Sequence, residues 1–165
     1  MNVINMVINC RVLESDDVPS YRDIRLESLK LHPEAYGSNY DTERKKSELF
    51  FENQIKNQSS ENLMIGAFHH SMLVGLCGLI TIENDQFSIV QMYVKSAYKG
   101  QGIGQALLSK AKSLLLQYQR SGLVLTVYEH NKQALNSYIQ AGFQETSRRE
   151  NEIVMQFGHG VLLVS

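Results

Sequence analysis

The chain has 165 residues, of which 43% are hydrophobic and 20% are charged, as in a globular protein that forms one domain over residues 1–165. A net charge of −1 at pH 7 and a pI near 6.5 exclude the strong basic field that general nucleic-acid binding needs. No apolar run reaches the roughly 18 residues of a membrane span. The N-terminus lacks the features of a signal peptide, so we expect a cytoplasmic protein with neither a nucleic-acid nor a membrane partner.

The first third of the chain predicts one strand followed by two helices. β-Branched residues over 3–12 predict the strand, and the Ser-Asp-Asp run at 15–17 offers N-cap candidates for the first helix. That helix is expected to end near His32, because a residue before proline is disfavoured in helical geometry. A turn-rich loop follows, and apolar residues then predict a second helix over 47–57.

From residue 62 onward, strands alternate with two further helices. Apolar residues at helical spacing after Gly104 predict a long helix, and Asn131 is an N-cap candidate for a shorter one that Gly142 would end. The strands are predicted at 63–69, 72–82, 87–94, 123–128, 143–147 and 152–157. Consecutive antiparallel strands before a crossover helix indicate a mixed α/β layer. Cys10 and Cys77, far apart in apolar surroundings, are expected to be buried free thiols.

The most informative motif is the run Lys99-Gly100-Gln101-Gly102-Ile103-Gly104, which joins a predicted strand to the long helix. Glycines let backbone N–H groups approach a ligand closely, and the first N–H groups of a helix lack intrahelical partners. Together these features favour phosphate binding. The spacing excludes a Walker A loop and the Gly-x-Gly-x-x-Gly dinucleotide fingerprint, whose third glycine would fall on Gln105 or Leu107.

Two segments resemble the GCN5-related N-acetyltransferase (GNAT) family. Tyr93-Val94 and the glycine run resemble its Arg/Gln-x-x-Gly-x-Gly/Ala signature, although Lys99 stands where arginine or glutamine is usual. Residues 131–143 resemble its Asn-x-x-Ala-x-x-x-Tyr-x-x-x-Gly-Phe block. The resemblance implies an α/β (α+β) fold with a mixed, mostly antiparallel sheet of six or seven strands. About four helices would flank this sheet, and its strands would splay at the cofactor site.

The resemblance also implies acetyl-CoA as co-substrate, with no metal. Backbone groups of Met92 and Val94 would bind the pantetheine arm, and N–H groups from Gly100 to Gln105 would bind the pyrophosphate. Asn131 would either reach the pantetheine or cap the next helix. The predicted cofactor-binding residues are Met92, Tyr93, Val94, Lys99, Gly100, Gln101, Gly102, Ile103, Gly104, Gln105, Asn131 and Tyr138.

Tyr138 is the predicted catalytic residue, because a phenol can protonate the CoA thiolate as general acid. The strand before the glycine run, Phe87 to Met92, has no carboxylate in the place of the family's frequent base. Glu83 is therefore a candidate base, with Glu129 and His130 also near in sequence and water as an alternative.

The N-terminal helices and the loop from Tyr36 to Tyr40 are expected to line the acceptor side. Glu27, Glu34 and Asp41 could there attract a cationic amine.

The predicted function is transfer of an acetyl group from acetyl-CoA to a primary amine of a small molecule or protein. Two alternatives remain open at this point: a non-catalytic acyl-CoA-binding module, and an acyltransferase for a longer acyl chain. The apolar tail at 161–164 could join the sheet or the interface of a homodimer.

Overall fold

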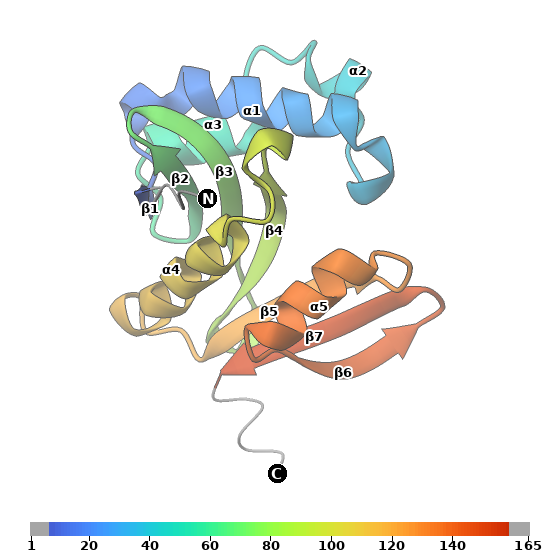
Figure 1. Ribbon diagram of the computed structural model, residues 1–165. Helices are drawn as coiled ribbons and strands as arrows, with labels where there is room; N and C mark the ends of the chain where they lie inside the picture. The colour runs from blue at the N-terminus through green and yellow to red at the C-terminus, as the bar shows by residue number, and fades with distance from the viewer. Residues whose placement is uncertain (1–6, 159–165) are drawn as a thin grey trace.

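The computed structural model describes residues 7–158, which form a seven-stranded sheet with helices on both faces (Figure 1). The strands are β1 (Ile8–Val12), β2 (Asn62–His69), β3 (Met72–Ile82), β4 (Gln86–Val94), β5 (Gly122–Tyr128), β6 (Gln144–Arg149) and β7 (Glu152–Gly158). The helices are α1 (Val18–Leu31), α2 (Tyr40–Glu43), α3 (Phe50–Lys56), α4 (Ile103–Gln117) and α5 (Lys132–Gln140). The predicted α/β class and sheet are confirmed, whereas the predicted apolar tail lies outside the described residues.

The sheet has the strand order β1-β2-β3-β4-β5-β7-β6. All neighbouring strands are antiparallel except β4 and β5, which run parallel and share only three residue pairs, from Gln86↔Gly122 to Ser88↔Val124. Beyond these pairs the two strands diverge, and Figure 1 shows β4 rising toward α1 while β5 turns toward α5. The predicted splay of the sheet is thus present between β4 and β5.

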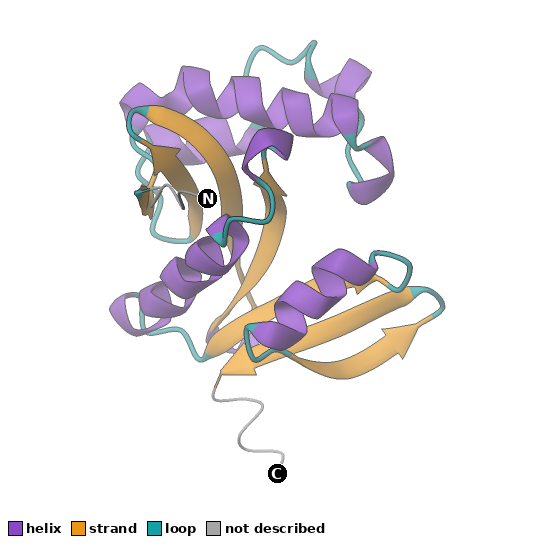
Figure 2. Ribbon diagram, viewed as in Figure 1, coloured by secondary structure: helices purple, strands orange, loops and turns teal. Residues whose placement is uncertain are grey.

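The two faces of the sheet bury separate apolar clusters. Helices α1 and α3 cover one face, where Tyr21, Phe51 and Leu76 are fully buried, and α4 covers the other, where Leu107 and Cys77 are fully buried. Figure 2 shows these helices on opposite sides of the strands, with α5 beside β5 and β7. Both cysteines are free thiols as predicted, and Cys77 is buried, whereas Cys10 is only half-buried.

A glycine holds β5 close to its neighbours at the end where the sheet does not splay. A Cβ atom added to Gly122 would lie 2.6 Å from the backbone oxygen of Phe157 on β7, far inside van der Waals contact. Gly122 also pairs with Gln86 at the first step of the short parallel ladder. The absence of a side chain at this position therefore lets β4, β5 and β7 meet at the paired end, from which β4 and β5 then diverge.

Three local details differ from the sequence prediction. Asp17 precedes α1 but makes no side-chain cap to it, because its carboxylate accepts hydrogen bonds from Arg11 at 2.7 and 3.0 Å and from the Glu14 N–H. The short helix α2 was not predicted, and α3 begins at Phe50, three residues later than expected. Within residues 7–158, no helix has the length and apolar character that crossing a membrane requires.

Candidate active site

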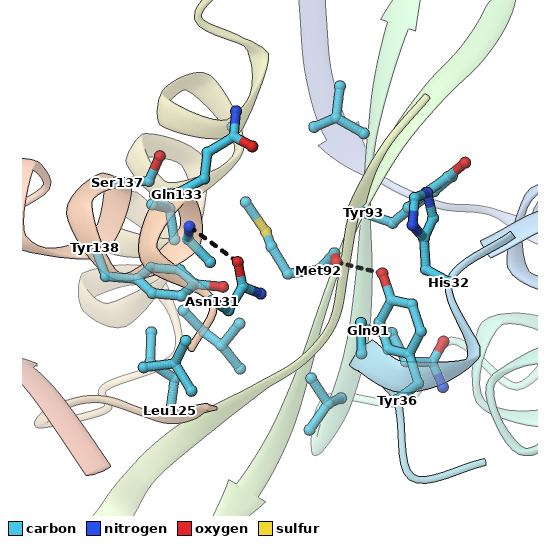
Figure 3. Close-up of a pocket in the computed structure, with 18 of the residues that line it drawn as sticks. His32, Tyr36, Gln91, Met92, Tyr93, Leu125, Asn131, Gln133, Ser137 and Tyr138 are labelled. Carbon is cyan, nitrogen blue, oxygen red and sulfur yellow. Dashed lines mark hydrogen bonds between the residues drawn. The ribbon is translucent and has the colours of Figure 1, made fainter. Parts of the chain in front are cut away.

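The splay between β4 and β5 opens a cleft of about 1080 Å³ with two unlike walls (Figure 3). The α4–α5 wall consists of the turn at 99–105, the end of β5 and residues 130–140. The α1 wall consists of Arg25, residues 32–38, Phe50 and Phe51. The second half of β4 lies between these walls, so a ligand in the cleft can contact side chains of both.

A β-bulge shapes β4 where it faces the cleft. Leu76 pairs with Tyr93 and Gly78 pairs with Val90, so Cys77 on β3 stands opposite both Gln91 and Met92. Gln91 adopts a left-handed backbone with a φ of 54°. A bulge of this kind bends the strand and changes the direction in which its groups point.

Two tyrosines from the α1 side hold the bulge by hydrogen bonds. The Tyr21 hydroxyl donates to the side-chain oxygen of Gln91 at 2.7 Å, and the Tyr36 hydroxyl donates to the Met92 carbonyl at 2.8 Å. The second of these bonds is drawn in Figure 3. Side chains from the α1 side therefore hold both residues of the bulge.

The glycine turn presents backbone N–H groups at the start of α4. Gly100 and Gly102 have φ values of 77° and 81°, a conformation that side chains disfavour. The first helical bond runs from the Ala106 N–H to the Gly102 carbonyl at 3.0 Å, so the N–H groups of Ile103, Gly104 and Gln105 have no partner within the helix. At the positive end of a fifteen-residue helix, these groups can bind a phosphate.

Helix α5 brings Tyr138 to the cleft. Its N-cap is Asn131, whose side-chain oxygen accepts a hydrogen bond from the Ala134 N–H at 3.3 Å, so the predicted capping role is present. Tyr138 is 9% exposed and its ring centroid lies 5.9 Å from that of Phe143. Burial raises the pKa of the Tyr138 phenol, and Cys77 and Tyr36 raise it further. The phenol therefore keeps its proton at neutral pH, and no hydrogen bond joins its hydroxyl to another residue of the described chain.

The cleft brings together all but one of the residues predicted to bind the cofactor. Those lining it are Met92, Tyr93, Val94, Lys99, Gly100, Gly102, Ile103, Gly104, Gln105, Asn131 and Tyr138. The exception is Gln101, which is exposed and donates a hydrogen bond to the Ala97 carbonyl at 3.4 Å.

The candidate bases are placed differently from one another. Glu83 is exposed in the turn before β4, at the end where β4 and β5 are still paired, and does not line the cleft. Glu129 also lies outside it and is paired with Arg148 at 2.9 Å. His130 does line the cleft and stacks on Tyr128, with 5.5 Å between ring centroids. The role of Glu83 as a base stays a prediction, which its exposed position outside the cleft does not favour.

The expected acidic acceptor side is not what the structure shows. Glu27 accepts a hydrogen bond from the Tyr93 hydroxyl at 2.7 Å, Asp41 pairs with Arg44 at 3.3 Å, and neither lines the cleft. Only Glu34 of the three lines it.

The α1 wall instead contributes residues that the sequence reasoning missed. Arg25 and His32 both line the cleft. Arg25 lies four residues after Tyr21 and three before Ser28, a spacing that places it on the same, buried face of α1. This spacing is the sequence feature from which the burial of Arg25 could have been predicted.

The sequence carries the acetyltransferase (GNAT) domain, whose family model matches residues 39–157. The chain belongs to the GNAT acetyltransferase family. It is an N-acetyltransferase that uses acetyl-CoA. The matched region contains the glycine turn, both splayed strands and α5, and so includes the whole α4–α5 wall of the cleft.

Two curated relatives of this GNAT protein are named as N-acetyltransferases. A Bacillus subtilis (strain 168) protein, proposed to be a ribosomal protein bS18-alanine N-acetyltransferase, is 29% identical over 130 residues, which are 79% of this chain and 83% of that protein. Thialysine N-epsilon-acetyltransferase of Bos taurus is 37% identical over 59 residues, which are 36% of this chain and 35% of that protein.

Solved GNAT structures share the fold of this chain. The PaiA N-acetyltransferase of Thermoplasma acidophilum, solved in complex with coenzyme A, superposes with a TM-score of 0.78 at 25% identity and covers 93% of this chain and 100% of its own. A GNAT acetyltransferase of Streptococcus pneumoniae superposes with a TM-score of 0.76 at 17% identity, covering 92% of this chain and 99% of its own.

Proposed function

We propose that this GNAT protein transfers the acetyl group of acetyl-CoA directly to a primary amine in a ternary complex, with Tyr138 as general acid. One observation carries the proposal: a buried, protonated phenol without a hydrogen-bond partner in residues 7–158 faces the cleft between the splayed strands. The bS18-alanine and thialysine acetyltransferases support an amine acceptor, in a protein or a small molecule.

The residues of the α4–α5 wall fit coenzyme A. The N–H groups at the start of α4 would bind the pyrophosphate, and Lys99 would add a positive charge at the edge of this turn. The backbone of Met92 and Val94 would bind the pantetheine as an added strand does. Asn131 uses one side-chain oxygen for its cap, which leaves its amide N–H groups for the same arm. When bound, acetyl-CoA supplies a thioester as the acetyl donor.

As the amine nitrogen bonds to the thioester carbonyl and the C–S bond breaks, Tyr138 would donate its proton to the leaving sulfur. The proton that the nitrogen loses on becoming an amide would pass through water and restore the phenol. The raised pKa of the phenol suits this role, because a general acid must hold its proton until the transition state. General acid catalysis of this kind contributes roughly 10²–10⁴-fold to the rate.

No side chain is assigned as base. The acceptor amine needs only to arrive neutral, and we propose that it loses its proton to water before attack. On this basis kcat/KM should rise with pH until the free amine is deprotonated, and Glu83→Gln should leave that profile unshifted. A shift in the Glu83→Gln profile would return that residue to the mechanism.

The test is release of free CoA thiol, measured with a panel of amines and with acetyl- and longer acyl-CoA donors. The proposal expects turnover with acetyl-CoA and at least one primary amine. Clear preference for a long acyl chain would contradict the choice of donor, and equal turnover by wild type and Tyr138→Phe would contradict the role of Tyr138.

A further inference from the structure

A buried arginine on the α1 wall has no anionic partner. Arg25 is only 6% exposed, and its Nη1 atom is buried without a hydrogen-bond partner. No hydrogen bond or ion pair joins its guanidinium to any side chain of the described chain. A buried charge is costly unless it is paired, so a guanidinium in this state is unusual.

Three carboxylates near α1 are bound to other cations or to a hydroxyl. Glu52 is paired with Arg22 at 2.6 Å and Glu43 with Lys46 at 2.9 Å. Glu27 accepts from the Tyr93 hydroxyl and lies 3.5 Å from Lys95. These bonds leave Arg25 with the Tyr36 ring, whose centroid is 5.1 Å from the guanidinium carbon. Contact with an aromatic face compensates only part of the cost of burying the charge.

The surroundings of Arg25 do not remove its charge at neutral pH. Burial lowers the pKa of the guanidinium, while the phenols of Tyr21 and Tyr36 and the Glu43 carboxylate oppose that shift. An arginine starts from so high a pKa that it stays protonated. The group therefore remains a cation with free donors.

A second unpartnered donor or acceptor lies on the same wall. The Nε2 atom of His32 is buried and has no hydrogen-bond partner, and its ring packs on Tyr93 with 5.8 Å between centroids. Its other ring nitrogen lies 3.8 Å from the exposed Glu34 carboxylate. Figure 3 shows His32 and Tyr36 on the opposite side of Met92 from Tyr138. His32 thus lies on the side of the cleft away from Tyr138, and Arg25, which also lines the cleft, packs on Tyr36 of the same side.

We propose that Arg25, assisted by His32, binds a carboxylate of the acceptor, so that the substrate is an amino acid: a primary amine that also carries a carboxylate. The inference rests on the proposed N-acetyltransferase function. A guanidinium presents parallel N–H donors that match the two oxygens of a carboxylate. The bound carboxylate would supply the anion that Arg25 lacks, while the amine extends across β4 toward Tyr138.

The first experiment compares acids with matched amides. Amino acids with increasing distance between amine and carboxylate are assayed beside their carboxamides. We expect kcat/KM for the best acid to exceed that for its amide by about 10- to 100-fold, the worth of hydrogen bonds to a charged group. Equal kcat/KM for acid and amide would overturn the inference. Preference for aminoalkyl phosphates of equal length would overturn the choice of a carboxylate.

The second experiment assigns the preference to Arg25. Arg25→Met should bring the acid-to-amide ratio close to one by lowering kcat/KM for the acid, with the amide little changed. Arg25→Lys should keep part of the preference, because lysine retains the charge without the fork. Arg149→Met, which removes an exposed arginine on β6, should keep the full ratio. A full ratio in Arg25→Met would overturn the inference. If Arg25→Met does not fold, the reduced ratio in Arg25→Lys decides.

A binding measurement separates this inference from the proposed function. Calorimetry with CoA present compares an N-acetyl amino acid with its N-acetyl amide, and needs no turnover. We expect tighter binding of the acid to wild type and equal binding of both to Arg25→Met. Carboxylate binding through Arg25 without acetylation of any amine would refute the proposed function alone. Acetylation of plain amines without carboxylate preference would refute this inference alone.

Discussion

The two walls of the cleft present different chemical groups to a ligand. The α4–α5 wall offers backbone N–H groups at a glycine turn and one phenol, all within residues 99–140. The α1 wall offers side chains from separate segments, among them Arg25, His32 and Tyr36. Backbone groups tolerate sequence change, whereas a side-chain surface changes with every substitution. The comparison suggests that one wall keeps a common co-substrate while the other selects the acceptor.

Tyr138→Phe tests the chemical role of the α4–α5 wall and should have the largest effect. Removal of the phenolic proton should lower kcat by roughly 10²–10⁴-fold, with little change in the Kd of acetyl-CoA. Because burial raises the pKa of this phenol above its ordinary value of about 10, the wild-type rate should show no loss from Tyr138 ionisation below pH 10. Thiol release measured against pH checks both statements. The matched control is Tyr118→Phe, a half-buried tyrosine outside the cleft that should leave kcat unchanged.

Gly122→Ala tests the close packing of β4, β5 and β7, which fixes how the two walls lie relative to each other. The new methyl group would overlap the Phe157 carbonyl oxygen, so β5 and β7 must separate. We expect the free energy of unfolding to fall by about 1–3 kcal/mol. Thermal unfolding should report a loss of roughly 2–4 °C per kcal/mol for a chain of this size. Gly37→Ala is the control, since no atom lies within 4 Å of its added Cβ, and a Tm loss equal to that of Gly122→Ala would contradict the explanation.

Tyr36→Phe tests whether the α1 wall acts apart from the cofactor side. Loss of the hydrogen bond to the Met92 carbonyl should cost about 1 kcal/mol of stability, or a fall in Tm of roughly 2–4 °C. The acceptor KM should rise, while the Kd of acetyl-CoA should stay within about twofold. A matching loss of acetyl-CoA affinity would mean that the bulge of β4 couples the walls too tightly for them to be treated separately.

Lys99→Ala should have the smallest effect, because an exposed lysine interacts with phosphate through water-screened charge. We expect KM for acetyl-CoA to rise about two- to fivefold and kcat to change less. Steady-state kinetics at low and high salt measure it, and the difference between wild type and variant should shrink as salt increases. A larger loss in kcat than in KM would indicate that Lys99 does not stand at the edge of the phosphate site.

The predictability of the two walls from sequence differs for a physical reason. The glycine turn and the Asn131–Phe143 segment are local patterns, in which spacing alone specifies a helix start and a cap. The order of strands and helices is equally predictable from sequence, because the periodicity of apolar residues is strong in β3, β4 and α4. The family resemblance then supplied the splay and the cofactor.

The α1 wall depends on contacts between distant segments, which no local pattern records. Tyr36 reaches Met92 across 56 residues, and Tyr93 reaches Glu27 across 66. The sequence shows three carboxylates near the expected acceptor side, but only the fold shows that Glu27 and Asp41 have partners elsewhere. Burial of Arg25 is likewise a tertiary property, although its position on the inner face of α1 hinted at it. Glu83 shows the converse, because its nearness in sequence to β4 does not place it beside the cleft.

One side-chain hydrogen bond has a consequence for which length of co-substrate the enzyme accepts. The Gln105 amide, in the first turn of α4, donates to the Ser137 carbonyl of α5 at 2.9 Å. This hydrogen bond links the proposed phosphate site at the start of α4 to Ser137, the residue before Tyr138. With the proposed roles, this bond between the two helices fixes the distance between the pyrophosphate site and the site of the thioester. A donor with a shorter or longer pantetheine arm could occupy the pyrophosphate site or the thioester site, but not both at once.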